Sequence, residues 1–437
     1  MALGAVVLFF VLVLAFAASA RALGRIDVTA PMAFVAAGAL LSIGLPELDE
    51  RAQQALTLLT EMTLALILFH DAAQVRPRQI TADRGLMARL LLVGLPLTIA
   101  AGWLLGRVTF PGLPGLMLLL LAASVAPTDA GLGAATVLNP VVPVRVRRML
   151  NVESGLNDGL CTPFVLFAIA ALAGEEGVAP TESIAAALLD LAVDILVGGA
   201  VGGGAGILLG WSREHGYSSR HTRPLGVLVL PLIAYFGAEA AGGNAFVSAF
   251  VAGTAFAGTA RWLEDEESSL ALTEAVADPL GFAVWLAFGF IAVPLLVEHV
   301  GWPEVVFAVL ALTLLRMVPV ALVLLGTGLR PQTVAFVGWF GPRGLASVVF
   351  TLLAAEGLEI DENLSRVISA ICLTVLLSVL AHGLSADPLS RRYGAWARRT
   401  RPTQELLGAT EPRSRRSLHH RGHAADAADA ADAAPPA

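Results

Sequence analysis

The sequence predicts an all-α protein that crosses a membrane about thirteen times. Of its 437 residues, 56% are hydrophobic and only 14% are charged, and the mean hydropathy is +0.75. A soluble domain carries about 25% charged residues. About a dozen apolar runs follow one another with short polar gaps, and each is near the ~20 residues that one membrane-spanning helix needs. Together these observations exclude a soluble globular protein.

The apolar runs define the expected spans in order. We expect them at residues 2–20, 28–45, 54–74, 87–108, 115–139, 149–173, 184–210, 224–241, 245–260, 278–297, 304–325, 332–354 and 364–385. The first run lacks the basic N-terminal region of a signal peptide, so we interpret it as a true span. The sequence Gly242-Gly243-Asn244 separates the eighth span from the ninth.

The arginines predict the orientation. All 28 basic residues are arginine. If the C-terminal tail is cytoplasmic, the odd-numbered loops hold fourteen arginines and the even-numbered loops hold three, while nine lie in the tail and Arg316 and Arg343 lie within spans. Positive charge is enriched in cytoplasmic loops. We therefore expect a multi-pass protein of the cell membrane with its N-terminus outside and its C-terminus inside.

We expect two parts of unequal size. Residues 1–387 form the transmembrane domain, with a core bundle at about 87–173 and 304–385 and a scaffold that takes the remainder. Residues 388–437 form a cytoplasmic tail that is first basic, and so suited to anionic lipid, and then low in complexity and disordered. The two cysteines lie in apolar runs, so neither a disulfide framework nor a cysteine metal site is expected.

The fifth span is interrupted at its middle. Pro127, Gly131 and Gly133 weaken the helix, and Thr128 and Asp129 fall at the break. Irregular backbone at membrane depth is tolerated only where it is buried or lines a cavity. Freed carbonyls and helix ends at such a break can bind ions.

The twelfth span carries a matching interruption. Residues 338–347 read Gly-Trp-Phe-Gly-Pro-Arg-Gly-Leu-Ala-Ser, with three glycines, a proline and a buried arginine. Two broken spans seven apart indicate two six-helix inverted repeats, spans 1–6 and 8–13, with the binding site between them.

The sixth span offers a carboxylate that can work. Ser154 and Asp158 are four residues apart and share a helix face, and Asn157 is adjacent. An ionisable group in hydrocarbon is costly and is kept when it is paired or functional. A carboxylate, a hydroxyl and nearby carbonyls make an all-oxygen site that suits a hard monovalent cation. Because the same carboxylate can bind a proton, competition between the two ions is enough to build exchange.

The third span ends with His70 and Asp71 near the expected cytoplasmic side. Asp71 is either a further ligand, a carboxylate of the entry funnel or a solvated interfacial residue. His70 titrates near neutral pH, which allows a pH-sensing role. An interfacial histidine without such a role is the alternative that we favour.

Two arginines within the spans need anionic partners. Glu153 is the best candidate for Arg343, because a permanent salt bridge would disable Asp158. We expect this pair to hold two halves of the core together. The partner of Arg316 could not be named from the sequence.

With these residues identified, the chain resembles the monovalent cation/proton antiporters of the NhaP-type sodium/proton exchanger family over about residues 5–385. The resemblance depends on the string Glu153–Gly159, on Thr128-Asp129 and on the Gly-Pro-Arg-Gly string of the twelfth span. It implies the NhaA/NhaP-like antiporter fold, in which two unwound helices cross near an ion-binding aspartate. It also implies a homodimer whose core moves against a dimerisation part, with no resident cofactor and no catalytic residue.

The resemblance also implies residue roles. Asp158 would bind the ion and the proton, and Asn157 would be the neutral neighbour that marks electroneutral exchange. The further ligands would be Ser154, Thr128 through its backbone, and Asp71. Asp129 would support the crossing, and Glu153 with Arg343 would be the structural ion pair. The transported ions would be H⁺ and Na⁺, or K⁺ or Li⁺, for cation and pH homeostasis, with no nucleic-acid partner.

Two rival functions are weaker. An intramembrane aspartyl protease could use Asp129 and Asp158 as a dyad that shares one proton, but Asn157 and the broken helices would then have no role. A proton-coupled transporter of an organic solute would be expected to carry more aromatic or basic residues at the breaks than Thr-Asp and Ser-Asn-Asp supply.

Overall fold

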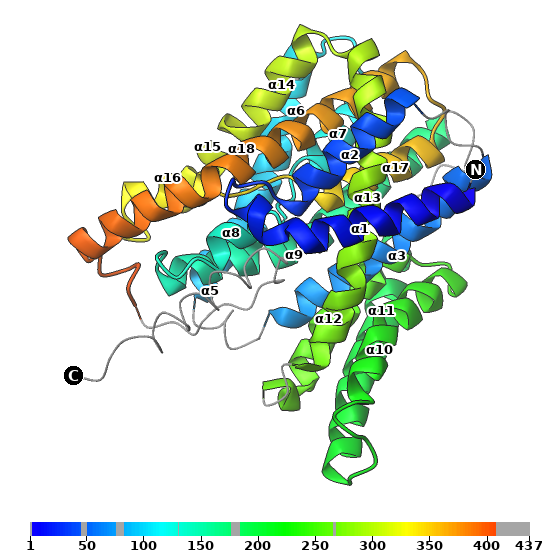
Figure 1. The fold of residues 1–437 in the computed structure, drawn as a ribbon, viewed down its shortest axis with the longest axis vertical. Coiled ribbons are helices and arrows are strands. Elements are labelled where there is room, and N and C mark those ends of the chain that lie inside the picture. The colour runs from blue at the N-terminus through cyan, green and yellow to red at the C-terminus, as the bar shows by residue number, and fades with distance from the viewer. Residues whose placement is uncertain are drawn as a thin grey trace.

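The computed structural model describes residues 2–44, 50–75, 83–129, 131–175, 184–264 and 268–407. Within these ranges every regular element is a helix, as predicted (Figure 1). The first half of the chain contains α1 (Ala2–Gly24), α2 (Ala30–Gly44), α3 (Glu50–Gln74), α5 (Arg84–Ala88), the π-helix η1 (Arg89–Gly94), α6 (Leu95–Thr109), α7 (Gly115–Ser124), α8 (Ala134–Val137), α9 (Val144–Glu175) and α10 (Ile184–Glu214). The second half contains α11 (Arg223–Ala240), α12 (Ala245–Thr259), the 3₁₀ helix η2 (Arg261–Glu264), α13 (Ser268–His299), α14 (Trp302–Leu312), α15 (Leu314–Val323), α16 (Pro331–Trp339), α17 (Leu345–Gly357) and α18 (Glu362–Thr400).

Each predicted span overlaps one helix or one broken pair of helices. In the described part of the chain, nine helices are long and apolar enough to cross a membrane. Four shorter apolar helices, α2, α7, α12 and α17, occupy further predicted ranges. The chain is therefore a multi-span helical membrane protein, while the count of thirteen and the inverted repeat remain predictions.

Two helices differ in detail from the predicted spans. The span expected at 304–325 matches the candidate span Trp302–Val323, and within it the helix breaks at Thr313 between α14 and α15. The span expected at 364–385 lies within α18, which continues to Thr400 through Pro388. The end of α18 is amphipathic, since Tyr393 and Ala397 are buried while Arg391 is exposed. The predicted disorder of the final segment concerns residues 408–437, which lie outside the described residues.

Small residues let two pairs of helices, α10 with α12 and α2 with α13, approach closely. A Cβ atom on Gly202 of α10 would lie 1.9 Å from the carbonyl oxygen of Ala252 on α12. A Cβ atom on Gly38 of α2 would lie 2.0 Å from a backbone carbonyl oxygen of α13. A Cβ atom on Gly289 of α13 would lie 2.1 Å from a backbone carbonyl oxygen of α2. Membrane helices pack through small residues at such interfaces.

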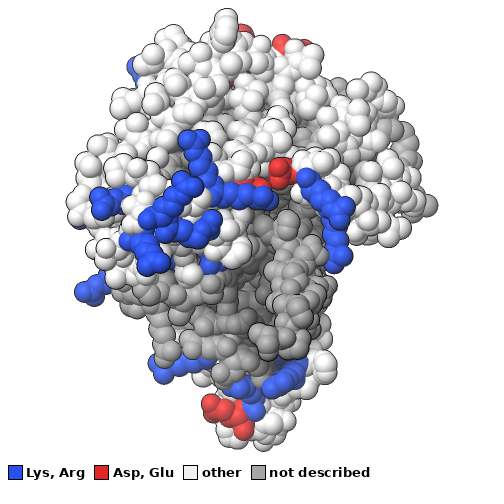
Figure 2. Space-filling model, turned by 60° about the vertical axis from the view of Figure 1, so that its left-hand side comes forward, with Lys and Arg blue, Asp and Glu red and all other residues white. Residues whose placement is uncertain are grey.

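The helices form two groups. Figure 1 shows α10, α11 and α12 together at one end, and α6, α7, α14, α15, α16 and α18 at the other. The helices α3, α9 and α13 connect the groups. Arginine side chains, blue in Figure 2, gather in bands, while most of the remaining described surface in that view is uncharged. That surface suits a lipid environment.

Candidate ion-binding site

Two interrupted helices cross inside the protein. The first interruption lies between α7 and α8, and the second lies between α16 and α17. The backbone N–H of Asp129 donates to the carbonyl of Pro342 at 2.8 Å. Arg343 donates from Nη1 to the carbonyls of Ala126 at 2.5 Å and Pro127 at 3.1 Å. The carbonyls that the break frees in one helix are thus bound by the arginine of the other.

The Asp129 carboxylate joins the ends of both broken helices. Its Oδ1 accepts from the N–H groups of Gly131 at 2.7 Å and Leu132 at 3.0 Å. Its Oδ2 accepts from the N–H of Leu345, the first residue of α17, at 2.8 Å. A carboxylate at a helix N-terminus satisfies an N–H without an intrahelical partner and complements the positive end of the helix dipole. Asp129 therefore links the two interruptions at the crossing.

Three of the predicted site residues form one hydrogen-bonded chain. Asn157 Nδ2 donates to Thr128 Oγ1 at 2.7 Å. Thr128 Oγ1 and Ser154 Oγ lie 2.9 Å apart. Thr128 comes from the broken segment, and the other two come from α9. The structure therefore brings together residues that are separated by 26 and 29 positions in the sequence.

Asp158, one residue after Asn157 on α9, has a carboxylate oxygen without a hydrogen-bond partner in the protein. The residue is 7% exposed, and its Oδ1, like Asn157 Oδ1, is buried without a hydrogen-bond partner in the protein. The nearby charges that act on Asp158 are those of Asp129 and Asp71. A buried polar atom almost always has a partner. Two buried acceptor oxygens next to hydroxyl groups are therefore suited to a ligand that carries positive charge or donates a proton.

Asp71 lies on α3 where that helix packs against α9. A Cβ atom on Gly155 would be 3.1 Å from the Asp71 carbonyl oxygen, so α3 and α9 are in close contact there. Asp71 is half-buried. His70 is fully buried rather than interfacial, and its Nε2 contacts Gln74 Nε2. The interpretation of His70 as an interfacial residue is therefore wrong, because α3 is covered by other helices at this depth.

The predicted ion pair between Glu153 and Arg343 is also wrong in its partner. Glu153 binds Arg316 of α15 at two points, with Nη2 donating to Oε2 at 2.7 Å and Nη1 contacting Oε1. Arg343 is fully buried and uses its backbone N–H to donate to Ser378 Oγ at 2.6 Å. The sequence offered two buried arginines for one glutamate, and only the tertiary structure, which brings Arg316 to Glu153, decides between them.

The sequence reasoning missed two residues of the crossing, Arg316 as the partner and Ser378 as an acceptor on α18. Ser378 and His382 are polar residues four apart in an apolar run, which was a usable signal. The Arg316 guanidinium also lies under Gly341, where a Cβ atom would meet Nε at 2.5 Å. Arg316 therefore contacts the second broken helix in addition to binding Glu153.

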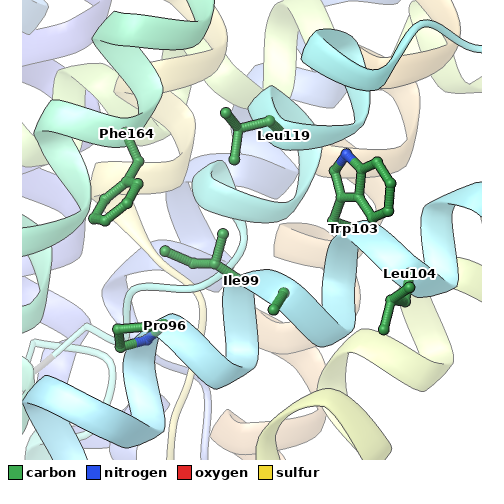
Figure 3. A pocket seen from close by; sticks show the side chains of 7 residues that line it. Pro96, Ile99, Trp103, Leu104, Leu119 and Phe164 are labelled. Carbon is green, nitrogen blue, oxygen red and sulfur yellow. The ribbon is translucent and has the colours of Figure 1, made fainter. Parts of the chain in front are cut away.

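The chemistry of the site is that of oxygen ligands. Within the ranges that the structure describes, no group of three His, Cys, Asp or Glu side chains could hold a metal ion. Hydroxyl, amide and single-carboxylate oxygens suit hard cations of low charge. A separate recess of about 430 Å³, between α6, α7 and α9, is lined by Pro96, Trp103, Phe164 and four further apolar residues (Figure 3). It carries no ionisable side chain, so it does not belong to an ion site.

Solved structures share this fold. The sodium proton antiporter MjNhaP1 from Methanocaldococcus jannaschii at pH 8 matches with a TM-score of 0.65 and 17% identity, over 90% of this chain and 99% of that one. An electron-microscopy map of MjNhaP1 matches with a TM-score of 0.67 and 16% identity, over 94% and 100%.

Curated relatives have related sequences. The K(+)/H(+) antiporter NhaP of Alkalimonas amylolytica is 26% identical over 342 residues, which are 76% of this chain and 57% of that protein. A Na(+)/H(+) antiporter of Schizosaccharomyces pombe is 28% identical over 350 residues, 69% of this chain and 71% of that protein. The chain thus spans little more than half the length of the first relative.

A model of one family covers most of the chain. The model of the transmembrane region of sodium/hydrogen exchangers matches residues 8–392. This range includes both broken helices, the chain of Thr128, Ser154 and Asn157, and Asp158. The chain belongs to the transmembrane sodium/hydrogen exchanger family, as its motifs predicted.

Proposed function

We propose that this chain is a secondary antiporter that exchanges a monovalent cation for H⁺ across the cell membrane. The observation that carries the proposal is the buried Asp158 carboxylate, whose Oδ1 has no hydrogen-bond partner in the protein. Asp158 directly follows Asn157, which is hydrogen-bonded to Thr128, and Thr128 in turn to Ser154. Family membership supports it. Na⁺ is our first choice of cation, and K⁺ and Li⁺ are alternatives, since relatives are named for both Na⁺/H⁺ and K⁺/H⁺ exchange.

In the proposed cycle, Asp158 binds either the cation or the proton. When a cation enters from one side, the oxygens of Asp158, Thr128 and Ser154 replace part of its hydration shell, and the carboxyl proton leaves. On the other side, a proton takes the carboxylate and the cation is released. The core, at about 87–173 and 304–385, would move against the rest of the chain to expose the site alternately. Asp71 would be a ligand or an entry carboxylate.

We infer electroneutral exchange from the neighbour of Asp158. Asn157 is neutral and donates its amide hydrogen to Thr128. The charge of Glu153, the other carboxylate of this segment, is neutralised by its ion pair with Arg316. One carboxylate is then left to change its state, so one positive charge would cross in each direction.

The protease alternative loses support from the geometry. A protease dyad requires two carboxyl groups that share a proton. Both Asp129 oxygens instead accept backbone N–H groups at the crossing, and Asp158 Oδ1 has no hydrogen-bond partner in the protein, so no proton is shared between the two residues through that oxygen.

The test uses purified protein in proteoliposomes that carry a pH-sensitive dye. We expect the wild type to dissipate an imposed pH gradient when Na⁺, K⁺ or Li⁺ is added, and the most effective cation identifies the substrate. Asp158→Asn should abolish exchange while the protein keeps its melting temperature in detergent. Asp190→Asn, on α10 and away from the site, is the control and should exchange normally. Exchange that survives in Asp158→Asn would show that another group carries the ions.

The same vesicles test the charge balance. Clamping the membrane potential with valinomycin and K⁺ should leave the Na⁺/H⁺ exchange rate unchanged if one charge crosses each way. A rate that follows the imposed potential would contradict the electroneutral proposal. Chemical cross-linking of the purified protein would test the predicted homodimer.

A further inference from the structure

The apolar recess between α6, α7 and α9 is built on one face of α6. Its volume is about 430 Å³, within the range of about 300–1,000 Å³ that is usual for ligand sites. Figure 3 shows Pro96, Ile99 and Trp103 one after another along α6, with Leu119 of α7 and Phe164 of α9 beside them. The lining residues of α6 recur at intervals of three and four positions, so they share one helix face.

The recess is open to the surroundings of the protein. Leu104 and Phe164 both line it and are 60% and 42% exposed. The polar atom among the lining side chains, the Trp103 indole nitrogen, donates its hydrogen to the Gly115 carbonyl at 2.9 Å. The recess therefore presents an apolar surface, and in a membrane the apolar material beside it is the acyl chain of a lipid.

Arg107 continues the same face of α6 toward the end of the helix. It follows Trp103 by four residues, and its guanidinium carbon lies 5.7 Å from the centre of the Trp103 ring. The side chain is exposed and, among the residues that the structure describes, forms no ion pair. Arg107 lies in the last turn of α6. A positive charge beside an apolar recess is complementary to a molecule with an anionic head and an apolar tail.

The spacing along α6 matches the two parts of a phospholipid. Because a helix rises about 1.5 Å per residue, Leu104 lies about 5 Å and Pro96 about 17 Å below Arg107 along the helix axis. Half of the hydrocarbon core of a bilayer is about 15 Å thick. A phospholipid whose head group contacts Arg107 therefore extends its acyl chain along the whole recess.

The head group decides which lipid binds, because the tail gains little. Lipid tails are as apolar as the side chains of the recess, so moving a tail from bulk lipid into the recess removes no apolar surface from water. An arginine binds phosphate through a planar fork of N–H donors. Phosphatidylglycerol keeps the negative charge of its phosphate, whereas the choline cation balances that charge in phosphatidylcholine.

We propose that the recess binds one acyl chain of an anionic phospholipid whose head group is held by Arg107. The lipid belongs to the leaflet on the side of the arginine-poor, even-numbered loops, because Arg107 flanks one of them. The bound chain contacts α7, which leads into the first interruption, and α9, which carries Asp158. Binding of the lipid does not depend on ion exchange.

Quenching of tryptophan fluorescence by bromine reports which lipid lies next to Trp103. The full-length protein would be reconstituted into two sets of vesicles, each with equal amounts of phosphatidylcholine and phosphatidylglycerol. Only one of the two lipids carries brominated chains in each set. The Trp103 signal is the difference between wild type and Trp103→Phe. We expect brominated phosphatidylglycerol to quench it about fivefold more strongly, the preference that one arginine near the membrane surface gives to an anionic lipid.

Three variants separate the head group from the recess. In Arg107→Gln the two brominated lipids should quench Trp103 equally, whereas Arg107→Lys keeps the charge and should retain most of the preference. Ala100→Phe fills the recess from α6 and should weaken the quenching of Trp103 by both lipids. Arg107 and Ala100 are exposed, so all three variants should keep the wild-type melting temperature in detergent.

Trp302 is the matched control. It is 78% exposed at the start of α14, it flanks another of the even-numbered loops, and it does not line the recess. The Trp302 signal is the difference between wild type and Trp302→Phe. The two brominated lipids should quench it equally, both with Arg107 present and in Arg107→Gln.

Each arm can overturn the proposal. Equal quenching of Trp103 by the two lipids in the wild type, or a preference that survives in Arg107→Gln, would rule out the head-group contact. If Trp103 is quenched in Ala100→Phe as in the wild type, the chain lies outside the recess. A Trp103 signal that neither lipid quenches would show that protein, such as a second copy of this chain, covers the recess. A wild type that exchanges no cation would overturn the proposed function and leave the lipid site standing.

Discussion

Glu153 of α9 and Arg316 of α15 form a two-point ion pair inside the core, with Nη2 and Oε2 at 2.7 Å. Both side chains are almost completely buried. The pair joins the helix that carries Asp158 to a helix 163 residues later in the chain. Glu153 is thus the carboxylate of this helix that forms the salt bridge, and Asp158 is not part of it. The sequence analysis expected Glu153 in this role, but with Arg343 as its partner.

Removing one member of this pair should destabilise the fold. Arg316→Met leaves the Glu153 charge buried without its partner, and we expect a loss of about 3–5 kcal/mol. The double variant Glu153→Leu/Arg316→Met should recover most of that loss, because no charge is left unpaired. Melting temperatures in detergent measure both effects.

The exposed pair formed by Asp387 and Arg391 serves as the control for this experiment. Its members are four residues apart on α18 and largely solvent-accessible, so Asp387→Ala should cost at most about 0.5 kcal/mol. An Arg316→Met protein that melts like the wild type would mean that the pair does not hold α9 and α15 together.

A methyl group at Gly344 should disrupt the crossing. A Cβ atom there would lie 1.9 Å from Asp129 Oδ2 and 2.3 Å from Asp129 Cβ. Gly344→Ala therefore forces Asp129 away from the α17 N-terminus, with an expected cost of about 1–3 kcal/mol and a severe loss of exchange. Gly199→Ala on α10 is the control, because nothing lies within 4 Å of the added atom. Normal exchange by Gly344→Ala would show that the Asp129 cap is dispensable.

The hydroxyl of Thr128 should matter more than its shape. Thr128→Val keeps the volume but removes the acceptor of Asn157 Nδ2 and the partner of Ser154 Oγ. An unpaired buried polar group costs about 1–3 kcal/mol, so we expect lower stability and a higher KM for the cation. Thr98→Val is the matched control, since the buried Thr98 hydroxyl donates only to Gly94 within its own helix segment, at 2.9 Å. Equal effects of the two variants on the KM would show that the Thr128 hydroxyl does not contribute to the site.

Much of this site could be predicted from the sequence because the cost of polar groups in hydrocarbon leaves few explanations. Asp158, Asn157, Ser154, Thr128 and Asp129 all stood out as polar residues in apolar runs, and the structure brings them to one crossing. Proline and glycine marked the breaks between α7 and α8 and between α16 and α17, because both residues weaken a helix locally.

What could not be predicted depends on packing between distant helices. Arg316 and Arg343 are both buried arginines, and no local pattern states which one α9 meets. The break at Thr313 and the π-helix at Arg89–Gly94 have no strong sequence signal either. Arg89 donates to the carbonyl of Leu325 at 2.8 Å, a contact 236 positions away that a local pattern does not reveal.

Competition at one carboxylate predicts the pH dependence of cation binding. If Asp158 binds either a proton or a cation, lowering the pH adds protons to the site and weakens cation binding. Once the carboxyl group is mostly protonated, the apparent KM should rise about tenfold for each further pH unit. Exchange rates measured over a matrix of Na⁺ concentration and pH test this. A KM that stays constant while only the maximal rate changes would indicate separate sites for the two ions.

The segment after α18 should stabilise the N-terminal end of α16. Glu405 is 1% exposed, and its Oε1 accepts from the Arg330 N–H at 2.8 Å and from the Thr333 hydroxyl at 2.7 Å. The Tyr393 hydroxyl lies 2.9 Å from the same Thr333 oxygen. Glu405→Ala removes the acceptor of the Arg330 N–H and one of the two partners of the Thr333 hydroxyl, and we expect a loss of about 1–3 kcal/mol.

Truncation provides the second arm of this test. A chain that ends at Thr400 lacks Glu405 and also Gln404, whose backbone and side chain accept from Arg145 Nη1. Arg145 in turn donates to Asp83 at 3.0 Å, so the segment links α16 to the start of α9. The truncated chain should therefore melt lower than Glu405→Ala, whereas a chain that ends at Leu407 should melt like the full-length protein. If ending the chain at Thr400 leaves the melting temperature unchanged, residues 401–407 do not contribute to holding these two helices together.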